Sequence, residues 1–401
     1  ADHSLNNPEG SPNKWRPFSF LYTDIFKYLS PYVEIIHIFF CMNQNSLRYF
    51  FITCIGMLAL SCKNPLPETV SKETMQEIYD NVKAPFKYGI VLAPPDSTKM
   101  TDSPTVFRLN GKWYMTYIIF DGRGYETWIA ESDDLLHWDT KGKLMSFTDG
   151  TWDASQKAGY PALIDIAWGG SYAPEKYDGK YWVSYLGGSD KGYEAGRLAV
   201  GMAHTTNLSE VKELEKLPQP VLSPTDSDVR WYDNKTIFKS SIIRDADKKT
   251  GYPFVMYYNA AGDSVWRNGR TFESIAMAVS NDMKHWERKG TQPLITKGRG
   301  ICGDAQIVKI KDVYVMFYFG HNWEDDNPSA FDRFACSYDL MNWTEWDGPN
   351  LIEPSKPYDK QYAHKPWVVR WEGVTYHFYN AVGENGRVIA LSTSKDLRIK
   401  Q

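Results

Sequence analysis

Alternation of apolar and polar residues dominates the chain from about residue 100 onward, and turn signals interrupt it at short intervals. The first such unit has an alternating run at residues 104–108, the pair Asn110-Gly111, and a second run at residues 112–117. An Asn-Gly pair between two alternating runs is a strong β-hairpin signal. A third run follows at residues 127–130. The pattern therefore predicts short antiparallel strands with little room for helices.

One short phrase follows the third predicted strand of every unit and occurs five times. Its full form is Ser-Asp-Asp-Leu-Leu-His-Trp at residues 132–138, and its Asp or Asn stands at positions 134, 207, 282, 339 and 396. A repeat of this length is one supersecondary unit that stacks on its neighbours. We therefore predict an all-β fold, a single five-bladed β-propeller with four-stranded antiparallel blades over residues 86–401. The phrase itself is interpreted as structural, with its Asp capping a turn and its Trp packing between blades.

The segment before the repeats has the character of a secretion signal. The first Met is Met42, Arg48 supplies a positive charge, and residues 49–60 form an apolar run. This run is too short to span a bilayer, which needs ~20 residues. It ends in Leu-Ala-Leu-Ser-Cys at residues 58–62, which resembles a bacterial lipoprotein signal whose cysteine, here Cys62, is lipidated. A plain signal peptide cut nearby is the alternative.

These features divide the chain into four parts. We expect residues 1–41 to be non-native translation upstream of the true start, and residues 42–61 to be the signal peptide. Residues 62–85 are predicted to be a tether that contains a short helical pattern at 72–82, and residues 86–401 form the propeller. The expected location is the bacterial cell envelope, on the periplasmic or outer-membrane surface, with the lipid anchor as the membrane contact.

Composition narrows the class of partner. The net charge is −4 and no basic block stands out, which argues against nucleic acid. Aromatic residues make up 15% of the chain; such rings stack on sugars, but they also fill β cores. Cys302 and Cys336 could form a disulfide in an oxidising compartment or remain buried thiols. No cysteine cluster with metal-ligand spacing is present, and the oligomeric state is left open.

Strand direction predicts which residues share the ligand-binding end of the propeller, here called the mouth. If the first strand of each blade runs away from the mouth, then first-strand starts, second-strand ends and third-strand starts all lie there. First-strand starts offer Asp102, Lys239, Asp304, His364 and Lys365, with Gly170-Ser171-Tyr172 as the matching place in the second blade. Second-strand ends offer Asp121, Asn259, His321 and Asn380, and third-strand starts offer Glu126, Glu194, Glu273 and Arg387.

Carboxylates gathered at one mouth indicate a chemistry. Crowding or burying them is costly unless they are paired or used. Glycoside hydrolysis uses two carboxyl groups, one to protonate the leaving oxygen and one to activate water or attack carbon. A like charge nearby raises the pKa of one of them, which suits it as the acid.

Several segments resemble the five-bladed propeller glycoside hydrolases, the group that contains families 43, 32, 62, 117 and 130. Asp102-Ser103-Pro104-Thr105-Val106 resembles the Asp-Pro-x-Val opening of the first blade. The segment at residues 172–175 resembles Trp-Ala-Pro-Asp of family 43, and residues 303–306 open the fourth blade where these families place an acid. Residues 363–367 open the fifth blade, where family 43 has an inner His. The Glu-Gly-Pro motif of family 43 is missing.

The resemblance implies an exo-acting, inverting glycoside hydrolase that acts on an oligosaccharide. Asp102 would be the general base, and Asp304 the second carboxylate, either as the acid or as a modulator of its pKa. Glu194 or Glu126 would be the proton donor or a sugar ligand. His364 would orient the substrate, carry a catalytic proton or hold an ion. Further substrate-binding residues are expected from the mouth positions: Asn259, His321 and Trp323 as sugar contacts, and Lys239 and Lys365 as anion-recognising groups or partners in salt bridges.

Two alternatives remain. In glycoside phosphorolysis, a basic cluster of Lys239, Lys365 and Arg387 would bind phosphate in place of water. The other alternative is a sugar-binding lipoprotein without catalysis, which the missing Glu-Gly-Pro motif favours. No cofactor is required and no metal ligand is assigned, although a structural Ca²⁺ or other ion could lie in the central channel.

Overall fold

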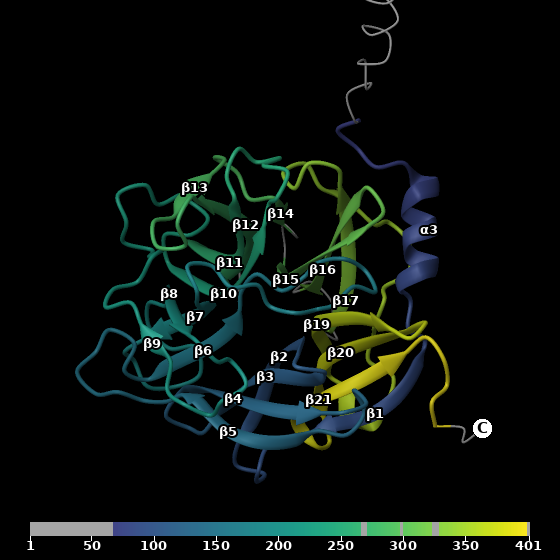
Figure 1. Ribbon diagram of the computed structural model, residues 1–401, viewed down its shortest axis with the longest axis horizontal. Helices are drawn as coiled ribbons and strands as arrows, with labels where there is room; N and C mark the ends of the chain where they lie inside the picture. Colours follow the sequence, from purple (N-terminus) through teal and green to yellow (C-terminus); the bar gives the residue numbers. More distant parts are fainter. Residues whose placement is uncertain (1–66, 266–270, 297–299, 323–328, 399–401) are drawn as a thin grey trace, which may run out of the picture. The chain divides into compact units, whose positions relative to one another are not determined.

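The computed structural model describes residues 67–265, 271–296, 300–322 and 329–398. Cys62 and Trp323 therefore lie outside the described residues. The described chain is nearly all β, and its strands form five antiparallel blades around a central axis (Figure 1), as the repeat predicts.

Each blade follows the chain from the axis outward. Blade 1 contains β2 (Met100–Leu109), β3 (Lys112–Phe120), β4 (Tyr125–Ser132) and β5 (Asp139–Met145), and blade 2 contains β6 (Gln156–Pro161), β7 (Tyr181–Gly188), β8 (Ala199–Thr205) and β9 (Glu215–Lys216). Blade 3 contains β10 (Thr236–Arg244), β11 (Phe254–Val265), β12 (Thr271–Ser280), β13 (Glu287–Lys289) and β14 (Ile295–Thr296). Blade 4 contains β15 (Gly300–Ile310), β16 (Val313–Asn322), β17 (Ala330–Ser337) and β18 (Thr344–Glu345), and blade 5 contains β19 (Tyr362–Trp371), β20 (Val374–Gly383) and β21 (Gly386–Thr393).

The outer strand of blade 5 comes from the other end of the fold. Strand β1 (Phe86–Leu92) pairs antiparallel with β21, from Phe86↔Thr393 to Leu92↔Ile389, and lies beside it in Figure 1. Within the described residues, the last copy of the repeated phrase is not followed by an outer strand of its own. Residues far apart in sequence therefore complete one blade and close the ring.

The repeated phrase acts as the sequence predicts. Asp134 accepts hydrogen bonds from the backbone N–H of Leu136 (2.8 Å) and His137 (2.9 Å), which caps the turn. Trp138 packs edge-on against Phe378 of blade 5, with ring centroids 5.8 Å apart. The phrase thus sets both the turn and the contact between neighbouring blades.

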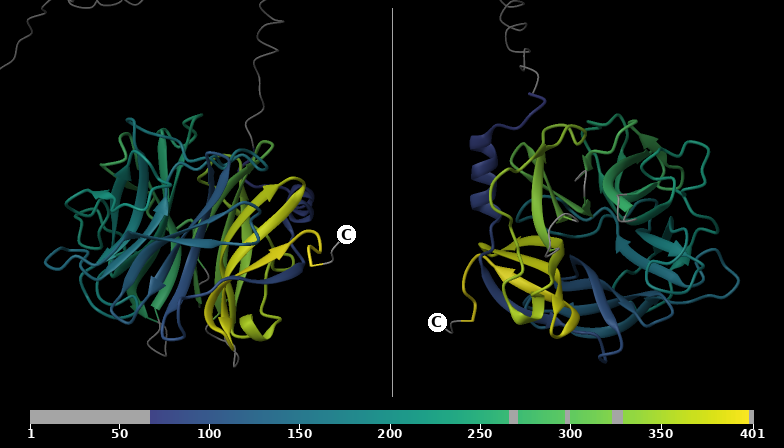
Figure 2. Two further views of the ribbon diagram at one scale, coloured as in Figure 1. Left: turned by 60° about the horizontal axis from the view of Figure 1, so that its bottom comes forward. Right: turned by 180° about the vertical axis from the view of Figure 1, so that it is seen from behind.

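Helix α3 (Lys72–Val82) forms over the segment where the sequence predicts one. The Ser71 side chain caps it by accepting a hydrogen bond from Thr74 N–H (3.2 Å). Its buried face, Met75, Ile78 and Val82, joins an apolar cluster that is built mainly from blade 4. Figure 2 shows the helix beside that blade from behind. No helix in the described residues is long and apolar enough to cross a membrane.

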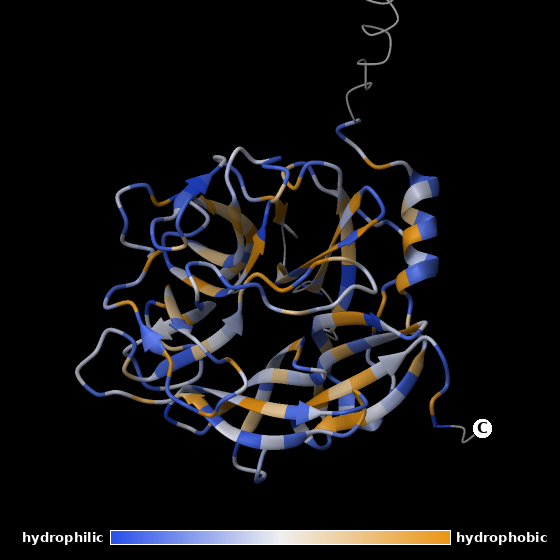
Figure 3. Cartoon of the chain, in the orientation of Figure 1, coloured by the Kyte–Doolittle hydropathy of each residue, from blue (hydrophilic) through white to orange (hydrophobic). Residues whose placement is uncertain are grey.

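Apolar side chains fill the spaces between blades. One cluster combines Met115 of blade 1, Tyr185 of blade 2 and Phe378 of blade 5, all fully buried. Along the strands, hydrophobic and hydrophilic positions alternate in many places (Figure 3). Cys302 and Cys336 are buried thiols and do not form a disulfide, because they lie at different levels of blade 4, opposite Gly320 and Val315 respectively.

A buried ion pair links β1 to blade 5, which gives a first prediction. Lys87 of β1 donates to Asp359 Oδ2 (2.6 Å), and the two side chains are 10% and 0% exposed. Asp359→Ala leaves Lys87 without its partner, so we expect a loss of about 3 kcal/mol of unfolding free energy in urea denaturation. The control is Glu384→Ala, which breaks the exposed Lys360–Glu384 pair of the same blade and should cost under about 1 kcal/mol. Equal losses would contradict a closing role for the buried pair.

Candidate active site

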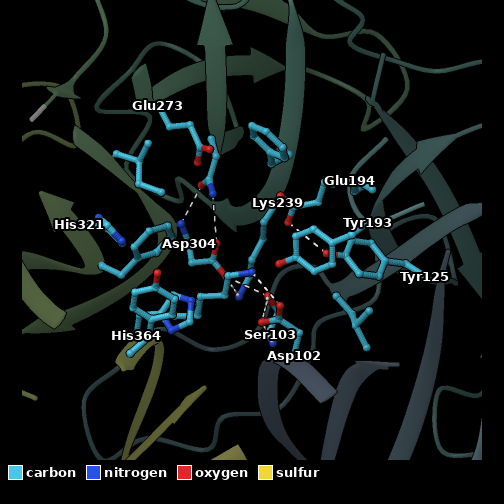
Figure 4. Close-up of a pocket in the computed structure, with 18 of the residues that line it drawn as sticks. Asp102, Ser103, Tyr125, Tyr193, Glu194, Lys239, Glu273, Asp304, His321 and His364 are labelled. Atoms are coloured by element: carbon cyan, nitrogen blue, oxygen red, sulfur yellow. Dashed lines mark hydrogen bonds and ion pairs between the residues drawn. The ribbon is translucent and has the colours of Figure 1, made fainter. Parts of the chain in front are cut away.

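A cavity of about 260 Å³ opens at the mouth. It lies where the strand-direction argument places it, at first-strand starts, second-strand ends and third-strand starts. Figure 4 shows a close-up of this cavity. The lining side chains that carry charge or hydrogen-bonding groups come from all five blades. They are Asp102, Ser103, Tyr125, Tyr160, Tyr193, Glu194, Lys239, Asn259, Glu273, Asp304, His321, Tyr362, His364, Lys365 and Arg387.

A β-bulge at the start of four first strands aims these side chains. The strand register shifts between Asp102 and Thr105, between Ile237 and Ser240, between Gly303 and Gln306, and between His364 and Trp367. In three of these bulges the first residue inside the shift has a positive φ: Ser103 (45°), Asp304 (56°) and Lys365 (62°). A positive φ is strained for a residue with a Cβ, and such strain is found at functional sites. The repeat thus explains why different blades present polar groups at the same level.

Asp102 is held by two cations from blade 5. Its Oδ2 accepts from Lys365 Nζ at 3.0 Å and from Arg387 Nη1, and its Oδ1 accepts from Ser103 N–H at 2.8 Å. Burial alone would raise the pKa of Asp102, but Lys365 and Arg387 outweigh it and hold the pKa far below its usual range. The shift favours the ionised form of Asp102 and makes its carboxylate a weaker proton acceptor.

Asp304 has a matching arrangement with blade 3. Lys239 Nζ lies 3.2 Å from Oδ2, Asn259 Nδ2 donates to Oδ1 at 3.0 Å, and Ser103 Oγ donates to Oδ2 at 3.1 Å. Burial opposes ionisation, yet the Lys239 and Lys365 charges lower the pKa of Asp304. Lys239 and Lys365 are thus in salt bridges, one of the two roles that the sequence allows them.

Glu194 stands on the loop between β7 and β8. Gln156 Nε2 donates to the carbonyl oxygens of Asp190 (3.0 Å) and Gly192 (2.7 Å), which holds this loop against the start of β6. Tyr125 Oη donates to Glu194 Oε1 at 3.1 Å. Burial raises the pKa of Glu194 above its usual value, although Lys365 opposes the shift. This carboxylate has a hydrogen-bond donor but takes part in no ion pair within the described residues.

Glu273, near the start of β12, is the carboxyl group whose role the sequence does not identify. Within the described residues, its carboxyl group takes part in no hydrogen bond or ion pair. Burial, followed by the negative charge of Glu194, raises its pKa to about 8. Asp304 raises it further, and Lys365 opposes the shift. Glu273 and Glu194 lie on different walls of the cavity (Figure 4). The raised pKa favours the protonated form of Glu273 at neutral pH.

His364 lies inside the cavity as a neutral base. Its Nδ1 is 3.2 Å from the carbonyl oxygen of Asn380, so this nitrogen carries the proton and Nε2 is left as an acceptor. Burial, then the charges of Arg387 and Lys365, lowers its pKa to about 3. His321 also lines the cavity, with its ring centroid 5.2 Å from that of Tyr362.

Two side chains that the sequence predicts at the mouth lie elsewhere in the structure. Glu126 lies in β4 next to the cavity residue Tyr125, but its side chain points to the outer strand, where Lys143 Nζ is 2.9 Å away. The first strand of blade 2 is β6, so its mouth residues come from 156–160. Tyr172, predicted at this place, lies at the opposite end of the propeller, where its carbonyl accepts from Arg108 N–H.

No group of three or more His, Cys, Asp or Glu side chains suited to a metal ion occurs in the described part of the chain. Three cations, Lys239, Lys365 and Arg387, already lie among the carboxylates of the mouth. An ion in the central channel stays a prediction.

Several solved structures are similar to this chain. No family model and no curated protein matches the chain. A solved structure named as an RGII complex of BT0996 is 47% identical with a TM-score of 0.78, over 82% of this chain and 97% of the other. Another, named glycoside hydrolase, is 46% identical with a TM-score of 0.78, over 82% and 96%. The family 117 enzyme Zg3597 of Zobellia galactanivorans is 15% identical with a TM-score of 0.54, over 80% and 93%, and shows the fold alone.

Nearly half of the aligned residues are identical to those of a named glycoside hydrolase, over almost the full length of that protein. The propeller and its carboxylate-lined mouth agree with that relationship. This chain is a member of the glycoside hydrolases built on a five-bladed β-propeller.

Proposed function

We propose that this glycoside hydrolase removes a terminal sugar from an oligosaccharide, with Glu273 as the general acid and Glu194 as the catalytic carboxylate. The observation that carries the proposal is the contrast among the four acids of the mouth. Asp102 and Asp304 are fixed in ion pairs, whereas Glu194 and Glu273 face the cavity without a cationic partner among the described residues. Carboxyl groups outside ion pairs can exchange protons with a substrate, and paired ones are poor at it.

The roles of the two glutamates follow from their surroundings. A general acid must be protonated at working pH, and burial together with Glu194 raises the pKa of Glu273 to about 8. Burial raises the pKa of Glu194, but Tyr125 donates a hydrogen bond to it, and the nearby Lys365 and Arg387 charges oppose the rise and favour the ionised form. Glu194 therefore serves as the base that activates water, or as the nucleophile.

Asp102 and Asp304 then take supporting roles. Asp102 pairs with both Lys365 and Arg387 and offsets one of their two charges, and Asp304 raises the pKa of Glu273 by its charge. This is the modulating role that the sequence offers as one option for Asp304. His364, neutral in this setting, presents Nε2 to a sugar hydroxyl.

The shape of the site supports exo action. A cavity of about 260 Å³ is just below the ~300–1,000 Å³ of typical ligand pockets, so it suits a terminal unit better than a long polymer. We infer that the substrate is an RGII oligosaccharide, the kind of ligand named for the 47% identical structure. Inversion, implied by the resemblance in sequence, stays a proposal; NMR of the first-formed anomer decides it.

Removing each acid in turn distinguishes the two assignments. Glu194→Gln and Glu273→Gln should each lower kcat/KM on RGII oligosaccharide by ~10²–10⁴-fold, because each removes an acid–base group. Glu273→Gln should retain far more activity on a 2,4-dinitrophenyl glycoside of the same terminal sugar, whose leaving group needs no proton. Asp102→Asn and Asp304→Asn are the comparison variants. If either of them, and not Glu273→Gln, shows this dependence on the leaving group, the acid is misassigned.

The pH profile tests the state of Glu273. Because its folded pKa is raised to about 8, the acid is present below that pH, and kcat/KM should fall as pH rises through about 8. Asp304→Asn removes a charge that raises this pKa, so the alkaline limb should move to lower pH. Asp149→Asn, at a surface pair with Arg123, should leave the limb in place. An unmoved limb in Asp304→Asn would show that another group sets it.

We also propose attachment of the enzyme to the cell envelope through lipid on Cys62. The support is the sequence signal alone, since this residue lies outside the described part of the chain. In a bacterial host, Cys62→Ala should shift the full-length protein from the membrane fraction to the soluble fraction and remove metabolic labelling by palmitate. Ser61→Ala is the matched control and should leave both unchanged. Membrane recovery of unlabelled protein would contradict the anchor.

A further inference from the structure

A large aromatic side chain stands exposed on the mouth side of blade 3. Trp231 lies between β9 and β10 and is 53% exposed, more than any other large hydrophobic residue in the described ranges. Strand β10 begins five residues later, at Thr236, and its start is a mouth position because Lys239 lines the cavity. Because its backbone also packs against Gly262 at the mouth end of β11, Trp231 lies on the mouth side of blade 3, which is here called the rim.

The loop that carries Trp231 is held in place by one buried arginine. Arg288, 3% exposed, donates to Asp233 (2.6 Å), Asp228 (2.7 Å) and Asp226 (3.0 Å), which flank Trp231 in sequence. Arg230 N–H also donates to Asp233 Oδ1 at 2.6 Å. A fixed backbone reduces the conformational entropy lost on binding. The exposed ring is thus presented by a preorganised loop.

The same loop packs against β11, the strand that pairs with the strand of Glu273. A Cβ placed on Gly262 would lie 2.2 Å from the carbonyl oxygen of Trp231, so only glycine permits this approach. The neighbouring Ala261 pairs with Glu273 across β11 and β12, and its carbonyl accepts from Lys235 N–H at 3.1 Å. The rim tryptophan and the proposed acid are therefore joined through two adjacent residues of β11.

We propose that Trp231 is a carbohydrate-stacking platform for the part of the substrate that leaves, on the aglycone side of the cleaved bond. The inference rests on the proposed role of Glu273. A general acid lies next to the leaving oxygen, so the sugars attached to that oxygen pass over the rim beside the acid. Indole offers a large apolar face to the C–H groups of a sugar ring. The structure thereby assigns specificity for the leaving sugars to blade 3.

The test compares a long and a short leaving group. Trp231→Ala should lower the ratio of kcat/KM for RGII oligosaccharide to that for the 4-nitrophenyl glycoside of its terminal sugar by about 10-fold. Trp231→Phe, which keeps a ring, should recover part of the ratio. The matched control is Phe86→Ala, another exposed aromatic residue (39%), on β1 opposite Thr393 and away from the mouth; it should leave the ratio unchanged.

Binding without turnover separates this inference from the proposed function. In a Glu273→Gln background, calorimetric titration with RGII oligosaccharide should give about 10-fold weaker binding when Trp231→Ala is added. If the parent enzyme cleaves nothing, weaker binding still supports Trp231 as a sugar-stacking platform, while the proposed function and the assignment to the aglycone side fall. Equal binding and an unchanged kcat/KM ratio in a folded Trp231→Ala protein would overturn the platform while hydrolysis stands.

Discussion

Charge balance in the desolvated mouth is the constraint on which the site depends. Lys239, Lys365 and Arg387 supply three positive charges, and Asp102 and Asp304 supply two negative ones through direct ion pairs. One further negative charge makes these charged groups neutral overall. Two further negative charges would leave one unbalanced negative charge, which is costly in a buried site. With His364 neutral, this balance calls for one ionised and one protonated glutamate. That is the pair of protonation states a glycoside hydrolase needs.

The ion pairs also connect the blades around the axis. Asp102 of blade 1 is held by two cations of blade 5, and Asp304 of blade 4 is held by Lys239 of blade 3 and by Ser103 of blade 1. Breaking one partner would leave an uncompensated charge at the centre of the ring. The ion pairs of the mouth therefore help to close the ring of blades at the axis, and the Lys87–Asp359 pair helps to close it at the outer edge of blade 5.

The sequence predicts the fold and most of the mouth because both follow from local periodicity. The repeated phrase marks the end of each third strand, and strand direction then brings Asp102, Lys239 and Asp304 to one end. Two failures have physical reasons. Glu126 follows Tyr125 by one residue, and in a strand that one step turns a side chain to the other face. In blade 2, β6 pairs with β7 without the register shift that the neighbouring first strands have. The start of this strand therefore differs from the others, and the sequence argument places the mouth position at residues 170–172 instead of 156–161.

The role of Glu273 shows a further limit of sequence. Its position at the mouth follows from strand order, but its proton affinity depends on Glu194, Asp304 and Lys365, which lie in three other blades. No local pattern encodes that sum of charges. Likewise, the pairing of β1 with β21 joins two ends of the fold that share no repeat signal.

The two glutamates are held by contacts from different blades of the propeller. Glu194 is fixed from blades 1 and 2, through Tyr125 and the backbone contacts of Gln156. Glu273 belongs to blade 3, beside the rim loop that Arg288 holds. In the proposed mechanism, a sugar bound between them would have its reacting carbon near the axis, and its leaving sugars would lie over blade 3. Changes in the blade 3 loops could then alter the accepted leaving group while the charge balance at the axis stays intact, because the two depend on different contacts.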